Sequence, residues 1–243
     1  MDTFTHPVRP FRCPRWCLLW IAAVWAMAPA AAAMAQSSTI TISGSDYTKR
    51  YLPLLEAIYG ELGYRVNFLE EPAERALRDA NSGVADANVG RVLGALDLYP
   101  NLLYTKEPLT TVDVQVWARK GTSPLVRTLE DLKRYSVGAA IGSKAVELLA
   151  QSAGLSLEQA VTVDQLAAML GHRRIDLALV TDITVTPALS AVGWPMVSAL
   201  SSQKAYHIVN RAHADLIPRF DAIARAMKFD GRYKKFLPEK PIP

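Results

Sequence analysis

Strand-like and helix-like segments alternate along the first part of the chain after residue 37, and this alternation limits the possible folds. The strands are short runs of β-branched and apolar residues, and the helices carry apolar residues at helical spacing. The expected elements are a strand at 38–44, a helix at 52–62, a strand at 64–70, a helix at 72–83 and a strand at 85–90. This order predicts a parallel sheet with right-handed crossovers.

A second set of alternating segments follows. Its expected elements are a strand at 112–121, helices at 128–135, 143–154 and 161–172, strands at 136–142 and 175–182, a strand at 205–211 and a closing helix at 216–231. Two short α/β units separated by a long strand predict two lobes. Ligands of open α/β sheets lie beyond the carboxyl ends of the strands, so the site is expected there.

The first 35 residues have the layout of a secretory signal peptide. Three arginines precede the apolar run Cys17–Met27, and Ala33-Met34-Ala35 is a small-x-small cleavage sequence. An uncleaved membrane anchor is the alternative, but Pro29 and the alanines after it favour cleavage. We therefore expect a protein of the bacterial periplasm.

Charge and cysteine content narrow the function further. The chain has a net charge of +4, and removal of residues 1–35 takes away three of 27 Lys/Arg and one of 23 Asp/Glu, which leaves +2. This balance gives no sign of a nucleic-acid-binding surface. Both cysteines lie within the first 35 residues, so no disulfide is expected. The histidines share no metal-ligand spacing on one element, so we expect no metal and no cofactor.

Arg91 follows Gly90 at the expected end of the third strand. A side chain at this place faces the crevice of a parallel sheet. An arginine there suits a bidentate contact with a ligand carboxylate. The alternative is an ion pair at the rim, for example with Glu107 or Asp97.

Ser143 and Lys144 lie at the turn between an expected strand and an expected helix. Free backbone N–H groups, a hydroxyl and the positive end of a helix dipole all suit an anion. The alternative is an ordinary serine N-cap with a solvated lysine.

Further candidates lie after the first strand and after the strand at 175–182. Asp46 and Tyr47 follow the first strand, where an aromatic ring can cover an apolar or cationic ligand group. Thr181 and Asp182 end the later strand, where either can accept a ligand ammonium or hydroxyl group. The alternatives are packing for the tyrosine and a turn for the aspartate.

Five stretches of the sequence resemble one known family in their order and spacing. The stretches are ALRDANSGVADANVGR, YPNLLYTKEPL, TLEDLKRYSVGAAIGSKAVELL, LAAMLGHRRIDLALVTD and FDAIARAMKFDGRYKKF. Together they resemble the type 2 periplasmic solute-binding proteins, solute-binding family 3, which includes amino-acid-binding proteins associated with ABC transporters. The resemblance covers residues 38–237.

The resemblance implies a two-lobed type 2 periplasmic binding protein fold, each lobe a mostly parallel sheet flanked by helices. Residues 36–116 plus 205–243 would form the first lobe and 117–204 the second, with two crossing strands and a ligand between lobes that close about a hinge. The family's anion contact falls on Ser143 and Lys144. The family's carboxylate-binding arginine falls near Leu98, so Arg91 is the candidate replacement, and its ammonium-binding aspartate falls on Thr181.

The expected function is capture of a small polar, carboxylate-bearing, amino-acid-like ligand for transport or sensing. The expected partners are that ligand and an inner-membrane ABC permease or a sensor, and a monomer is expected. One alternative is an enzyme on the same fold, similar to cyclohexadienyl dehydratase, with Glu70, Glu71 or Glu107 as the general acid. The other is a ligand-sensing or protein-interaction module without transport. The sequence contains no nucleophile elbow, no Ser/His/Asp arrangement and no phosphate loop, which favours the binding protein.

Overall fold

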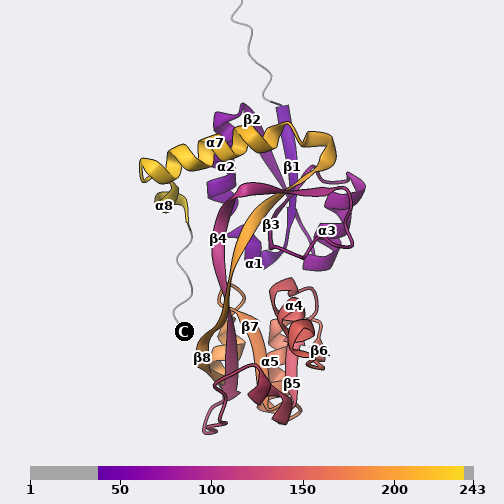
Figure 1. Ribbon diagram of the computed structural model, residues 1–243, viewed down its shortest axis with the longest axis vertical. Helices are drawn as coiled ribbons and strands as arrows, with labels where there is room; N and C mark the ends of the chain where they lie inside the picture. Colours follow the sequence, from indigo (N-terminus) through magenta and orange to yellow (C-terminus); the bar gives the residue numbers. More distant parts are fainter. Residues whose placement is uncertain (1–37, 238–243) are drawn as a thin grey trace, which may run out of the picture. The chain divides into compact units, whose positions relative to one another are not determined.

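The computed structural model describes residues 38–237 of the chain. Within the unit Ser37–Pro243, eight strands form one sheet in the order β2-β1-β3-β8-β4-β7-β5-β6 (Figure 1). The expected signal peptide at 1–35 lies outside the described residues. None of the helices between residues 38 and 237 has the length and apolar character needed to cross a bilayer.

The first lobe is built on three parallel strands, with β1 in the middle. Its elements are β1 (Ser38–Gly44), α1 (Asp46–Lys49), α2 (Leu52–Glu61), β2 (Tyr64–Glu70), α3 (Ala73–Ser82), β3 (Ala87–Val92), α7 (Leu216–Phe229) and α8 (Arg232–Phe236). Side chains alternate along β1. Ile40 and Ile42 enter a core with α2 and α7, whereas the Ser43 hydroxyl donates to the Ala76 carbonyl of α3.

The second lobe repeats the parallel arrangement. Its elements are η1 (Glu130–Arg134), β5 (Val137–Ala140), α4 (Lys144–Ala153), β6 (Glu158–Ala160), α5 (Val163–Gly171), β7 (Leu177–Thr181) and α6 (Pro187–Val192). β5 lies between β6 and β7 and is parallel to both. All five residues of β7 are buried, because the strand is covered on both faces by apolar clusters.

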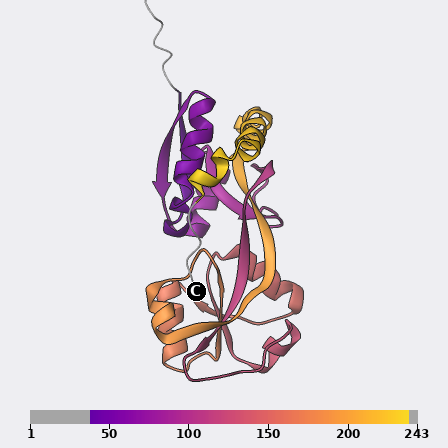
Figure 2. The same cartoon turned by 90° about the vertical axis from the view of Figure 1, so that its left-hand side faces the viewer.

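Two long antiparallel strands, β4 (Leu102–Arg119) and β8 (Gly193–Asn210), run side by side through both lobes (Figures 1 and 2). Their pairing extends from Leu102↔Asn210 to Arg119↔Gly193, with several register shifts. The sequence predicted only residues 112–121 and 205–211 as strands here. The other halves contain prolines and polar residues with no clear alternation, so they were missed. The division into lobes at residues 116 and 205 stays a prediction.

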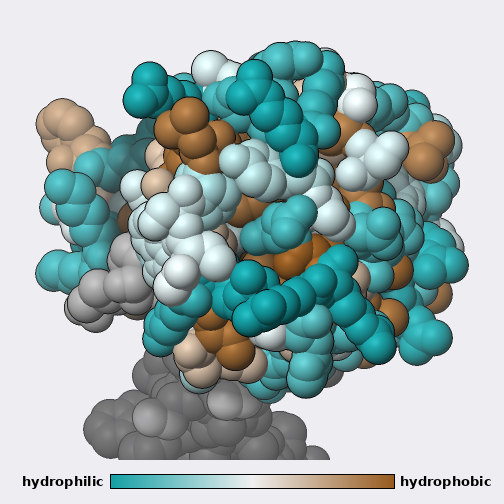
Figure 3. Space-filling model, turned by 90° about the horizontal axis from the view of Figure 1, so that it is seen from below, coloured by the Kyte–Doolittle hydropathy of each residue, from teal (hydrophilic) through white to brown (hydrophobic). Residues whose placement is uncertain are grey.

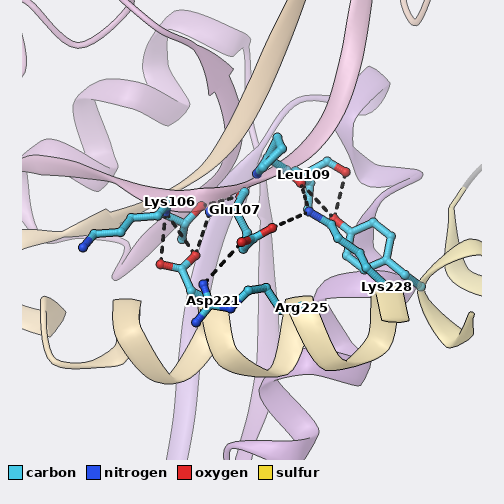
Figure 4. A network of polar contacts seen from close by, with 9 residues as sticks. Lys106, Glu107, Leu109, Asp221, Arg225 and Lys228 are labelled. Carbon is cyan, nitrogen blue, oxygen red and sulfur yellow. Dashed lines mark hydrogen bonds and ion pairs between the residues drawn. The ribbon is translucent and has the colours of Figure 1, made fainter. Parts of the chain in front are cut away.

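Helix α7 is fixed to the first half of strand β4 by a buried carboxylate (Figure 4). Asp221 is only 2% exposed and accepts hydrogen bonds from the backbone N–H groups of Lys106 and Glu107 at 2.9–3.1 Å. Next to it, the Glu107 side chain forms ion pairs with Arg225 and Lys228 of α7. These contacts hold the bent start of the long strand against the first lobe.

Three element predictions need correction. β3 continues to Val92, so Arg91 lies inside the strand, because a bulge between Asn88 and Arg91 lets the strand go on pairing with β8. The segment predicted as a helix at 128–135 is the 3₁₀-helix η1, since Asp131 accepts hydrogen bonds from Thr128 and holds a tighter turn. β6, α1, α6 and α8, which have six residues or fewer, were not predicted.

Candidate functional site

A cavity of about 110 Å³ lies between the two lobes, where the carboxyl ends of the parallel strands meet helix N-termini. Its walls come from the β1–α1 turn, from β3, from the β5–α4 turn, from the end of β7 and from both long strands. The lining residues are Ser45, Tyr47, Thr48, Ala73, Gly90, Arg91, Val92, Val112, Ala140, Ile141, Gly142, Ser143, Lys144, Ala145, Val163, Leu179, Val180, Thr181, Ile183, Thr184 and Ala205.

Arg91 places a cation in the wall of this cavity, and only 8% of the residue is exposed to solvent. Its terminal nitrogens donate to the carbonyls of Gly90 at 2.7 Å and Ala73 at 2.9 Å. Its Nε has no hydrogen-bond partner, and the guanidinium forms no ion pair with a carboxylate within residues 38–237. Burial lowers the pKa of Arg91 to about 10, so it stays charged at neutral pH. The arginine is thus a buried cation that forms no ion pair with a described carboxylate, although the charge of the nearby Glu74 favours its protonated form.

Lys144 lies at the start of α4, and its ammonium is already neutralised. Its Nζ is 3.1 Å from a carboxylate oxygen of Glu74 on α3 and 2.9 Å from Glu147 on α4. Tyr99 also donates a hydrogen bond to Glu74. Burial lowers the pKa of Lys144, but the hydrogen bonds to Glu147 and Glu74 outweigh this effect and leave the pKa above its usual value. Lys144 therefore links the two lobes, and its charge is paired with two carboxylates.

Ser143 is the N-cap residue of α4, but its side chain makes no capping hydrogen bond. The neighbouring Gly142 N–H donates to the Glu147 carboxylate at 2.7 Å. Gly142 has φ +81°, and a Cβ on it would lie 3.4 Å from Ala73, so the β5–α4 turn lies directly against the start of α3. The serine hydroxyl is left available at the cavity wall.

Tyr47 also lines the cavity. It belongs to α1 of the first lobe but packs against the apolar cluster of the second lobe that contains Val163 and Leu166. Burial raises the pKa of the Tyr47 phenol. Asp46, its neighbour, is exposed and does not line the cavity.

Thr181 and Asp182 face different ways although they are adjacent. Thr181 lines the cavity, and its hydroxyl lies 3.2 Å from that of Thr184. Asp182 is 4% exposed and accepts a hydrogen bond from the Asp113 backbone N–H at 3.0 Å, so its carboxylate secures β7 to β4. Of the seven candidates, the structure brings Arg91, Ser143, Lys144, Tyr47 and Thr181 to one cavity, and their role in binding stays a prediction.

Several lining residues were missed from the sequence. Thr48 follows the candidate Tyr47 by one residue, and Thr184 follows the candidate Thr181 by three, and neither belongs to a recognisable motif. Ala73 lies at the start of α3, a helix that the sequence predicted. Glu74 was not among the candidate site residues, and its pairing with Lys144 cannot be read from the sequence, because the contact joins two lobes.

The three glutamates considered as general acids lie elsewhere. Glu70 pairs with Lys49 at 2.7 Å on the surface, and Glu107 of β4 pairs with Lys228 and Arg225 of α7 (Figure 4). Glu71 lies at the end of β2, where burial and the nearby Asp79 raise its pKa. None of the three glutamates lines the cavity within residues 38–237. Residues 38–237 also hold no cluster of metal-ligating side chains.

Comparison with known proteins agrees with this geometry. No protein family and no curated protein sequence matches the chain. Solved structures do match. An ancestral arginine-binding protein bound to glutamine superposes with a TM-score of 0.68 at 18% identity, covering 82% of this chain and 96% of that one. A histidine kinase sensor domain with similarity to periplasmic binding proteins gives 0.69 at 20% identity, covering 82% and 93%.

A third match is an ancestral amino acid-binding protein described as a precursor of cyclohexadienyl dehydratase, with a TM-score of 0.68 at 16% identity over 82% of this chain and 93% of that one. The chain therefore has the two-lobed fold of the type 2 periplasmic solute-binding proteins. The fold class and the likeness predicted from sequence are confirmed at the level of the fold. At these identities the matches define the fold and leave the ligand open.

Proposed function

We propose that the protein is a periplasmic solute-binding protein that captures a small carboxylate-bearing ligand between its two lobes, for transport or for sensing. The observation that carries the proposal is the buried Arg91 cation in the cavity wall without a carboxylate partner among the described residues. A buried charge is costly unless it is paired, and a ligand carboxylate would supply the pair. Delivery by the expected signal peptide would place the protein in the periplasm.

Binding is favoured over the dehydratase-like enzyme because that reaction needs a general acid at the ligand. The cavity is lined by no Asp or Glu side chain of residues 38–237. A protein-interaction module would call for a broad exposed apolar patch. On the face of the molecule in Figure 3, hydrophilic side chains predominate and apolar residues form small separate patches.

A thermal-shift screen of the purified protein against amino acids, organic acids and polyamines tests the proposal. A ligand that binds only the folded state raises the melting temperature, so we expect a shift with carboxylate-bearing compounds. Arg91→Ala should then cost about 2–5 kcal/mol of binding free energy while the protein stays folded.

Arg211→Ala provides a matched control. Arg211 also donates to a backbone carbonyl, that of Pro100 at 2.9 Å, but it is exposed and does not line the cavity. We expect its ligand affinity to equal that of the wild type. Unchanged affinity in Arg91→Ala would remove Arg91 from the site, and a panel without any shift would contradict the solute-binding role.

A further inference from the structure

The charged groups of the cavity are all of one sign. Arg91 and Lys144 are the charged side chains among its lining residues, and Lys144 is neutralised by Glu74 and Glu147. The carboxylates of those two glutamates point at the lysine, at the Tyr99 hydroxyl and at the Gly142 N–H. No anionic side chain from the described part of the chain is thus presented to a ligand.

Helix N-termini strengthen this bias. The first residues of α3, α4 and α5, which are Ala73, Lys144 and Val163, all line the cavity. The positive ends of three helix dipoles therefore converge on the same space as the unpaired Arg91 guanidinium. A ligand carboxylate is attracted by the Arg91 guanidinium and by the three helix N-termini, whereas a ligand ammonium group is repelled by them and finds no carboxylate among the described lining residues.

The remaining wall is apolar with a few hydroxyl groups. Val92, Val112, Leu179 and Ile183 supply aliphatic surface, and Ser143 and Thr181 supply hydroxyls. The Ser143 hydroxyl makes no capping bond, so it can pair with a neutral polar substituent. A cavity of about 150 Å³ holds a benzene molecule, so about 110 Å³ suits a short aliphatic chain.

We infer that the ligand is a short aliphatic carboxylate without an ammonium group, such as a 2-hydroxy or 2-oxo acid, and not an α-amino acid. This inference rests on the proposed function and specifies the ligand class of the same site. The carboxylate would pair with Arg91, the aliphatic chain would lie on the valines, and the hydroxyl or oxo group would meet Ser143 or Thr181.

A matched ligand series tests the inference by calorimetry. L-valine, 2-hydroxy-3-methylbutanoate and 3-methyl-2-oxobutanoate share one skeleton and differ at C2, and the alanine and leucine series vary the chain length. We expect the hydroxy or oxo acid to bind at least about tenfold more tightly than the amino acid, because the ammonium group has no acceptor. Valinol, which has the ammonium group but no carboxylate, should not bind.

Equal or tighter binding of an amino acid would overturn the inference and leave the proposed function in place. If no member of any series binds, the inference also fails, and the broad thermal-shift panel decides on the proposed function separately. Thr181→Asp adds a carboxylate to the wall, so in the folded variant we expect the preference to move toward the amino acid. An unchanged preference in that folded variant would count against the inference.

Discussion

The Lys144 ammonium lies 3.1 Å from the Glu74 carboxylate, and the two residues belong to different lobes. Glu74 is in the first turn of α3, and Lys144 is the first residue of α4. Their side chains are only 33% and 18% exposed. Lys144 lines the cavity, and so does Tyr47, which packs on the second lobe's apolar cluster. The ion pair and the Tyr47 packing are therefore direct side-chain contacts between the two lobes.

Glu74→Gln should make the ligand-free protein more open. Glutamine can still accept the hydrogen bond from Tyr99, so the change removes mainly the charge that attracts Lys144. A partly buried pair of this kind is worth about 1 kcal/mol, and a ligand that binds the closed state should lose affinity by roughly fivefold. Small-angle scattering measures the opening, and calorimetry measures the affinity.

The control for this substitution is Glu70→Gln, which breaks the 2.7 Å pair with Lys49 inside the first lobe. We expect the scattering profile of this variant to match the wild type. If Glu74→Gln gives that same wild-type profile and affinity, the Glu74–Lys144 pair does not hold the lobes together.

Ser143→Ala should separate binding from stability. An N-cap serine normally stabilises its helix by about 1 kcal/mol, but the Ser143 side chain makes no capping bond. We therefore expect less than about 0.5 kcal/mol of lost stability and a several-fold loss of ligand affinity. Thr162→Ala is the matched substitution, because the Thr162 side chain does cap α5 by accepting from the Gln165 N–H.

For Thr162→Ala the expected order is reversed, with about 1 kcal/mol lost in urea unfolding and little change in affinity. If both variants lose equal stability and neither loses affinity, Ser143 acts only as a helix cap.

Much of the fold follows from local sequence, because the alternation of strands and helices is marked by residues with fixed backbone preferences. The predicted helix at 72–83 opens at Pro72 and closes at Gly83, and these two residues cap α3, with Gly83 at φ +85°. The first halves of β4 and β8 were missed, since strands that cross between lobes are exposed on alternating sides and carry no steady period.

Site residues were predictable only where they lie near the carboxyl end of a parallel strand, because ligands of open α/β sheets bind there. Arg91 and Ser143 follow from their places beside strand ends. The choice between Thr181 and Asp182 depends on the register of β7 against β4, in which Thr181 pairs with Val114. A shift of one residue turns a side chain to the other face, and the sequence alone does not set that register.

Asp221→Asn should destabilise the fold without affecting the ligand. Asp221 is buried and accepts hydrogen bonds from two backbone N–H groups, and an amide in its place turns one acceptor oxygen into a donor that faces them. We expect a loss of about 1–3 kcal/mol, seen as a lower urea midpoint with an unchanged m-value. A loss of ligand affinity in the folded protein would show instead that α7 is coupled to the cavity.

His207 should make stability depend on pH. His207 is fully buried on β8, and its ring stacks on that of Phe220 with 4.8 Å between the ring centroids. Its Nε2 lies 2.8 Å from the Tyr59 hydroxyl, and its Nδ1 lies 3.0 Å from the Val89 carbonyl oxygen. A neutral imidazole satisfies both contacts when Nδ1 donates to Val89 and Nε2 accepts from Tyr59. Burial lowers the pKa of His207 from 6.5 to about 4.

The sign of the pH effect follows from proton uptake. In the unfolded chain His207 takes up a proton as the pH falls below about 6.5, but in the folded chain it does so only near pH 4. Stability is therefore complete above pH 6.5 and is lost as the pH falls toward 4, by about 3 kcal/mol in total. His207→Gln cannot titrate, so its stability relative to wild type should improve by this amount between pH 7 and pH 4.

Urea unfolding of both proteins at several pH values measures the difference. Taking the difference between them removes the contribution of carboxylates that titrate in the same range, because both proteins contain them. His172→Gln, at an exposed histidine, is the matched control substitution. The difference in unfolding free energy between the wild type and His207→Gln could instead stay constant from pH 7 to pH 4. The folded protein would then accommodate a charged His207, and the neutral His207–Tyr59 pair would not be what fixes β8 against α2.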